Sequence, residues 1–115
     1  MRIVLDSSVL IAALARPGVC TELVDEVARE HTLILSEYIL DEVQRKLREK
    51  FKVSAKDALS LASGIRERGE LAAPVAVSKT ACRDPEDLGI LGTAAGGQAD
   101  LLVSVAKDLL TLGEY

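Results

Sequence analysis

The stretch IVLDSS, residues 3–8, places a short apolar run directly before an acid and two serines. A short continuous apolar run between polar residues is typical of a strand that a parallel sheet buries on both faces. Three further runs have the same character, and they are Leu33–Leu35, Val75–Val77 and Leu101–Val103. We therefore expect four short strands, of which Ile3–Leu5 is the first.

Helical patterns fill much of the chain between these runs. The predicted helices span residues 18–30, 36–50 and 54–68, and a fourth runs from Asp84 to the Gly96-Gly97 pair. Ser36 is a candidate N-cap, and the segment SAKD at 54–57 resembles a capping box. Strands that alternate with helices predict an α/β fold with a parallel sheet covered on both faces.

The composition indicates a single globular domain over residues 1–115. Hydrophobic residues make up 49% of the chain and aromatic residues only 3%, so the core must consist mainly of Val, Leu, Ile and Ala. The longest apolar run, 9–15, is shorter than the roughly 20 residues of a membrane span. Asp6 interrupts the apolar start that a signal peptide needs, and we therefore expect a cytoplasmic protein.

Cysteine, histidine and net charge limit the chemistry further. Cys20 and Cys82 lie far apart, and His31 is the only histidine, so no zinc site of ordinary spacing can be built and two free thiols are favoured. The net charge of −4 argues against binding nucleic acid by bulk attraction. The same net charge is compatible with a protein that binds phosphates through bound cations.

Acidic residues follow the predicted strands at the edge where parallel strands end. Asp6 directly follows the first strand, and Glu42 lies less than two turns into the helix that Ser36 opens. Asp108 follows the fourth strand, and Asp84, Glu86 and Asp87 begin the last helix. Because ligands of open parallel sheets bind at the carboxyl ends of the strands, these acids can converge.

Several carboxylates in one pocket repel each other unless a cation neutralises them. Ligand sets of oxygen alone, without Cys or His, suit Mg²⁺ or Mn²⁺. Such ions commonly bind phosphate oxygens and promote attack by water. The arrangement therefore suits phosphodiester hydrolysis.

Each acid also has a purely structural interpretation. Asp6 before two serines can cap a helix, and Asp84-Pro85 is a common helix start in which acids favour the positive end of the helix dipole. Glu42 on a helix can be a solvated surface residue, although it precedes the core residue Val43. The combination favours a metal site more than any single acid does.

Four segments of the chain resemble the successive motifs of a PIN domain. They are IVLDSSVLIAAL, LILSEYILDEVQRKL, CRDPEDLGILGTA and ADLLVSVAKDLLTLGEY. The resemblance covers nearly the whole chain and is greatest to the toxin components of toxin–antitoxin systems. It implies a three-layer α/β/α sandwich with a parallel sheet of four to five strands. It also implies cleavage of RNA with Mg²⁺ or Mn²⁺ as cofactor.

The same resemblance assigns roles to particular residues. Asp6, Glu42 and Asp87 would be the catalytic acids and metal ligands, with Asp84 and Asp108 as auxiliary ligands. The hydroxyl of Ser7 would support them. Basic residues after Glu42 on the same helix are weaker candidates for binding RNA phosphates, and they are Arg45, Lys46 and Lys50.

The chain departs from the family pattern at three places. Ala106 stands where a fourth acid is expected, which puts full nuclease activity in doubt, and Ser8 replaces a common Asn. Relatives usually continue past Tyr115 into a last strand and a closing helix. We therefore expect a sheet that is one edge strand short, with an edge that is available for a homodimer.

Two functions follow as hypotheses. The first is a metal-dependent endoribonuclease that acts as a toxin and is held inactive by a cognate antitoxin. The alternative is a catalytically weak or inactive PIN module that acts by binding RNA or a protein. A receiver-like phosphoacceptor is a third reading, but it would require paired acids after the first strand, where Asp6 stands alone.

Overall fold

The computed structural model describes residues 1–15, 18–73, 85–103 and 113–114, with the side chains of 85–88 and 113–114 left out. Five strands of these described residues form one sheet in the order β3-β2-β1-β4-β5. They are β1 (Arg2–Leu5), β2 (Thr32–Leu35), β3 (Glu70–Leu71), β4 (Leu101–Val103) and β5 (Gly113–Glu114). The strands β1 to β4 run parallel to one another, whereas β5 runs antiparallel to β4.

Three of the predicted strands are confirmed, and they are β1, β2 and β4. The predicted strand at Val75–Val77 lies outside the described residues. The strand next to β2 is instead β3, which the sequence analysis did not predict because its two residues, Glu70 and Leu71, form no apolar run. Since β5 pairs with β4, β4 is not an edge of the sheet. The absence of the family's last strand and helix stays a prediction.

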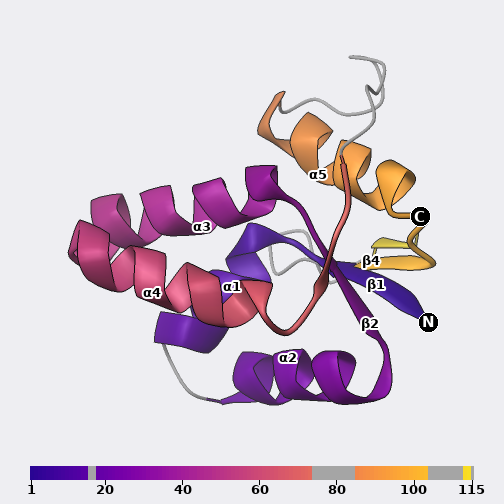
Figure 1. The fold of residues 1–115 in the computed structure, drawn as a ribbon, viewed down its shortest axis with the longest axis horizontal. Helices are drawn as coiled ribbons and strands as arrows, with labels where there is room; N and C mark the ends of the chain where they lie inside the picture. The colour runs from indigo at the N-terminus through magenta and orange to yellow at the C-terminus, as the bar shows by residue number, and fades with distance from the viewer. Residues whose placement is uncertain (16–17, 74–84, 104–112, 115) are drawn as a thin grey trace.

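Within the part of the chain that the structure describes, five helices surround this sheet (Figure 1). They are α1 (Ser7–Ala15), α2 (Val19–Glu30), α3 (Glu37–Lys50), α4 (Ala55–Arg66) and α5 (Pro85–Gly96). In Figure 1 α5 lies above the sheet and α2 below it, while α3 and α4 pack side by side, so the expected α/β architecture with both faces covered is confirmed. Among the described residues, no single helix is long and apolar enough to cross a bilayer, and only α1 and α2 taken together across a sharp bend pass by length and composition.

The core is aliphatic, as the shortage of aromatic residues predicts. The completely buried side chains include Val4 and Leu5 of β1, Ile34 and Leu35 of β2, and Leu40 of α3. Both serine caps are also confirmed: the hydroxyl oxygen of Ser36 accepts from the backbone N–H of Ile39, and that of Ser54 accepts from Asp57. The cap at Ser36 fixes the start of α3, the helix that carries Glu42.

Two further contacts hold α3 in place. The buried hydroxyls of Ser36 and Thr93 lie 2.7 Å apart and join the start of α3 to α5. On the other side, Glu37 forms an ion pair with Arg66 of α4. The Arg66 guanidinium lowers the pKa of Glu37, mainly through their hydrogen bonds, and Glu37 raises the pKa of Arg66 in return. The helix with the candidate acid is therefore fixed on both flanks.

The amino ends of the strands carry a different polar cluster. Arg2 donates from Nε to the carbonyl of Gly97 at 2.7 Å, and its guanidinium pairs with Glu70 and lowers the pKa of that carboxyl. The backbone N–H of Arg2 donates to Asp100 at 2.8 Å. These contacts tie β1 to β3 and to the segment after α5. This edge is structural, and the candidate site lies at the opposite one.

Candidate active site

Asp6 lies where β1 ends, beside the end of β4. Its backbone N–H donates to the carbonyl of Val103 at 2.9 Å. One side-chain oxygen, Oδ1, accepts from the backbone N–H groups of Ser8 at 2.9 Å and Val9 at 3.2 Å, and also from the Ser8 hydroxyl. Asp6 therefore caps α1, which is the structural role considered above. Within the described part of the chain, no hydrogen bond uses its other oxygen, Oδ2.

Glu42 is not the solvated surface residue of the alternative interpretation. It is buried, with 4% of its surface exposed, and its Oε1 accepts a hydrogen bond from the buried hydroxyl of Ser7. Ser7 follows Asp6 directly, so the end of β1 and the middle of α3 meet here. The structure thus brings two of the predicted site residues, Ser7 and Glu42, into contact, and Asp6 precedes Ser7 directly in the chain.

The second oxygen of Glu42 has a different environment. Oε2 is buried and has no hydrogen-bond partner among the described residues. Its ion-pair partner is Arg45, whose nearest guanidinium nitrogen lies 3.6 Å away. Buried carboxylates are normally neutralised by paired charges, hydrogen bonds or metal ions. An incompletely paired, buried oxygen of this kind fits a divalent cation.

The structure describes the other predicted ligands only in part or not at all. Asp87 belongs to the first turn of α5, but its side chain is not among those described, and Asp84, Ala106 and Asp108 lie outside the described residues. The described acids alone form no metal-binding group of three. The helix of Asp87 does pass close to α3, because a Cβ built on Gly89 would lie 2.4 Å from the ring of Tyr38.

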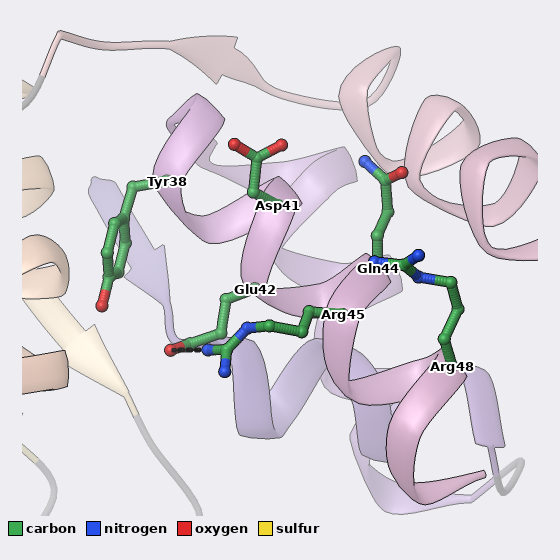
Figure 2. Close-up of a pocket in the computed structure, with 6 residues that line it drawn as sticks. All are labelled: Tyr38, Asp41, Glu42, Gln44, Arg45 and Arg48. Carbon is green, nitrogen blue, oxygen red and sulfur yellow. Dashed lines mark ion pairs between the residues drawn. The ribbon is translucent and has the colours of Figure 1, made fainter. Parts of the chain in front are cut away.

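A pocket of about 350 Å³ opens beside Glu42 on the surface of α3 (Figure 2). It is lined by Tyr38, Asp41, Glu42, Gln44, Arg45 and Arg48. Three of these residues, Tyr38, Gln44 and Arg48, were not among those predicted for the site. Their spacing around Glu42 along one helix was the available signal, but the same spacing is ordinary for a solvated helix face.

The three predicted RNA-binding cations do not share one surface. Arg45 lines the pocket with Glu42, whereas Lys46 and Lys50 line a second hollow of about 240 Å³ with Phe51 and residues of α1. Both hollows border α3. A nucleic acid strand that contacted all three cations would therefore have to reach both hollows.

Comparisons with known proteins agree with this fold. A family model described as the PIN domain matches residues 2–108, and the chain belongs to the PIN domain family. PIN domains generally use divalent metal ions. This finding confirms the family resemblance on which the roles of Asp6, Glu42 and Asp87 were based.

One similar solved structure is the crystal structure of VapBC2 from Rickettsia felis bound to a DNA fragment from their promoter. The match has a TM-score of 0.65 and 19% sequence identity, and it covers 90% of this chain and 86% of that chain. At this identity the likeness concerns the fold. No curated protein matches the chain.

Proposed function

We propose that this PIN domain is a metal-dependent endoribonuclease and the toxin of a toxin–antitoxin pair. The observation that carries the proposal is the buried carboxylate of Glu42 beside Ser7 and Asp6, at the edge of the sheet where parallel strands end. A pair of acids in this position, with one oxygen of each not hydrogen-bonded to any described residue, is suited to a hard cation. Mg²⁺ and Mn²⁺ are the cofactors we propose.

The chain's own residues would divide the work. Asp6 and Glu42 would hold the cation together with Asp87, and Ser7 keeps Glu42 in one orientation by its hydrogen bond. When bound, such an ion supplies positive charge that polarises a phosphodiester and promotes attack by water. Arg45, Lys46 and Lys50 would bind RNA phosphates on either side of the site. Asp84 and Asp108 are the proposed auxiliary ligands.

An antitoxin partner is part of the same proposal. The structurally similar chain comes from a complex named VapBC2 that is bound to promoter DNA. We propose that this chain likewise works with a cognate antitoxin in the cytoplasm. A homodimer is a further assembly that we propose for this chain.

The test is cleavage of a mixed RNA pool by the purified protein during a Mn²⁺ titration, with metal binding followed by calorimetry. Asp6→Asn and Glu42→Gln should each lower cleavage more than about 100-fold, because even groups that only orient metal ligands are worth roughly 10- to 100-fold. Asp57→Asn, an exposed acid on α4, is the matched control and should cleave like the parent. Circular dichroism checks that every variant is folded.

The second candidate is a PIN module that binds without cutting, and Ala106 in place of the expected fourth acid favours it. Saturable Mn²⁺ binding that is lost in Glu42→Gln, without cleavage by the parent, would support this candidate. The absence of any Mn²⁺ binding by the parent would reject the metal-dependent nuclease.

A further inference from the structure

The hollow of about 240 Å³ between α1 and the end of α3 combines an aromatic ring with two cations. We call it the Phe51 hollow. Its lining residues are Ser8, Ile11 and Ala12 of α1 and Lys46, Lys50 and Phe51 of α3. Its volume is below the roughly 300–1,000 Å³ of sites for drug-sized ligands, so it suits a smaller group.

Phe51 is the only phenylalanine of the chain, and it lies outside the aliphatic core. Its side chain is 47% exposed at the surface of the hollow. A single exposed apolar side chain is ordinary on a protein surface. The residues around Phe51 are what make this ring a candidate for binding.

Lys46 and Lys50 lie about one turn apart on the same face of α3, and both line the hollow. In the described part of the chain, neither lysine forms an ion pair or a side-chain hydrogen bond. Like charges at this spacing on a helix repel each other, and an anion between them would relieve the repulsion. The hollow therefore presents positive charge beside an aromatic ring.

The backbone around Phe51 is held in a defined turn. The backbone N–H groups of Phe51 and Val53 both donate to the carbonyl of Leu47, at 3.2 and 3.1 Å. Lys52 between them has a φ of 58°, in the left-handed region that residues other than glycine seldom adopt. Val53 packs against the core, so the chain is anchored directly after the turn. A ring on such a backbone is preorganised for contact with a ligand.

The Phe51 hollow adjoins the candidate active site. Ser8, which lines the hollow, donates its hydroxyl to Oδ1 of Asp6. Along α3, Glu42, Lys46 and Lys50 follow one another at intervals of four residues and therefore share one face of the helix. A polymer that occupied the hollow could thus continue towards the two acids.

We propose that the Phe51 hollow binds one unpaired nucleotide of the RNA substrate, with the base stacked on the ring of Phe51 and a phosphate between Lys46 and Lys50. Aromatic side chains stack on unpaired bases, and positive groups beside them hold the backbone of the strand. An acidic protein segment would pair with the lysines but would bring no base to the ring. The inference deepens the proposed function and rests on it, because it takes RNA to be the substrate.

Tryptophan fluorescence tests the stacking directly. Because the chain has no tryptophan, Phe51→Trp introduces a single fluorescent probe into the hollow. In an Asp6→Asn background, which prevents cleavage, single-stranded oligoadenylate should quench this fluorescence as a base stacks on the indole ring. Leu59→Trp in the same background replaces an exposed leucine of α4 and is the matched control, whose fluorescence the RNA should leave unchanged.

Affinities separate the base from the phosphate. In the Asp6→Asn background, Phe51→Ala should weaken binding of the oligoadenylate about 5- to 150-fold, the range for the loss of one stacked base, while Phe51→Tyr should keep the affinity. Inorganic polyphosphate has no bases, so Phe51→Ala should bind it as tightly as the background protein does. Lys46→Gln should weaken binding of both ligands. Fluorescence anisotropy measures the first ligand and calorimetry the second, and circular dichroism checks that each variant is folded.

The outcomes separate this inference from the proposed function. If the Asp6→Asn protein binds RNA and Phe51→Ala binds it equally well, the subsite fails while RNA binding stands. If neither the parent nor the Asp6→Asn protein binds RNA, the proposed function and the subsite both fail. Equal losses of affinity for RNA and polyphosphate in Phe51→Ala would show a general disturbance of the hollow and would overturn the stacking.

A protein segment is the rival occupant of the hollow. A synthetic peptide of leucine and glutamate that shifted the emission of Phe51→Trp to shorter wavelength, when RNA caused no quenching, would assign the hollow to a protein partner and overturn the subsite. Quenching by RNA without any shift by the peptide is the result that we expect.

Discussion

Gly97, directly after α5, shows how closely this helix approaches the sheet. A Cβ built on Gly97 would lie 2.5 Å from Cγ2 of Ile34 and 3.1 Å from the carbonyl oxygen of Thr93. Ile34 is completely buried in β2 and has no room to move away. Glycine at this position therefore lets the end of α5 settle on the central strands.

This contact predicts opposite effects for two glycine-to-alanine changes. Gly97→Ala should destabilise the fold by about 1–3 kcal/mol, the usual cost of overpacking a filled core. Gly64→Ala should stabilise it by about 0.5–1 kcal/mol, because Gly64 is exposed inside α4 and its Cβ would meet nothing within 4 Å. Urea unfolding measures both changes, and equal effects at the two positions would contradict this account of the packing.

The site residues differ in how far the sequence alone could place them. Asp6 could be assigned to the strand end because it directly follows an apolar run, and its additional role as a helix cap could be foreseen from the two serines after it. The burial of Glu42 was indicated only by its place before the core residue Val43, and its hydrogen bond with Ser7, 35 residues away in the sequence, could be expected only from the family resemblance. Asp87 could be assigned only by resemblance, and its side chain stays untested.

At the scale of elements, α3 contacts both α5 and α4 and also carries Glu42. Its first turn contacts α5 through Ser36 and Thr93, and its exposed side is joined to α4 by Glu37 and Arg66. Its middle supplies Glu42. A change in the position of this helix would therefore be transmitted directly to the site.

The ion pair between Glu37 and Arg66 predicts a specific dependence on pH. Arg66 lowers the pKa of Glu37 in the folded protein, so the ion pair stabilises the fold fully at a pH above 4.5, the ordinary pKa of a glutamate. This stabilisation is lost as the pH falls through the lower pKa that Glu37 has in the folded protein. Glu37→Gln should therefore melt slightly below the parent at pH 7, and the difference should shrink as the pH is lowered below 4.5.

Thermal melts of both proteins between pH 7 and pH 3 measure this effect. Glu49→Gln, an exposed change on the same helix, is the control and should show no comparable convergence with the parent. In 1 M NaCl the deficit of Glu37→Gln should be smaller at every pH, because salt screens exposed ion pairs. A deficit that persisted unchanged at pH 3 would show that Glu37 acts through packing.

Helices were easier to predict than strands, for a physical reason. The helices α2 to α5 each have a cap or an apolar periodicity that is local in the sequence, and the structure confirms all four. Strand β3 consists of two exposed residues that are ordered by pairing with β2, so nothing local marks it. The helix α1 was foreseen only as what Asp6 would cap, because its apolar residues form a continuous run without helical periodicity.

At the scale of the whole molecule, the charge is unfavourable for RNA. The net charge is −4, so binding must depend on local cations such as those along α3. Each phosphate contact with a single strand contributes about −0.7 to the slope of log affinity against log salt concentration. The slope therefore measures how many contacts with RNA phosphates the protein makes despite its negative net charge.

We expect Lys50→Gln to make that slope less steep by about 0.7, the value of one lost phosphate contact. Lys56→Gln, an exposed lysine on α4, should leave it unchanged. Fluorescence anisotropy with a labelled single-stranded RNA measures the slope, in an Asp6→Asn background that prevents cleavage. Equal slopes for all three proteins would show that Lys50 does not contact RNA.

The central position of β1 has a consequence for synthesis of the chain on the ribosome. The first strand to be made is paired on one side by β2 and on the other by β4, which is completed only at Val103. Until then, one edge of β1 stays open, and the backbone of Asp6 lacks the carbonyl that it contacts in the finished fold. The backbone of Asp6 therefore gains its last partner only after Val103 has been made, long after Asp6 and Glu42 themselves, so the strand end that carries the proposed site is among the last parts of the sheet to be fixed.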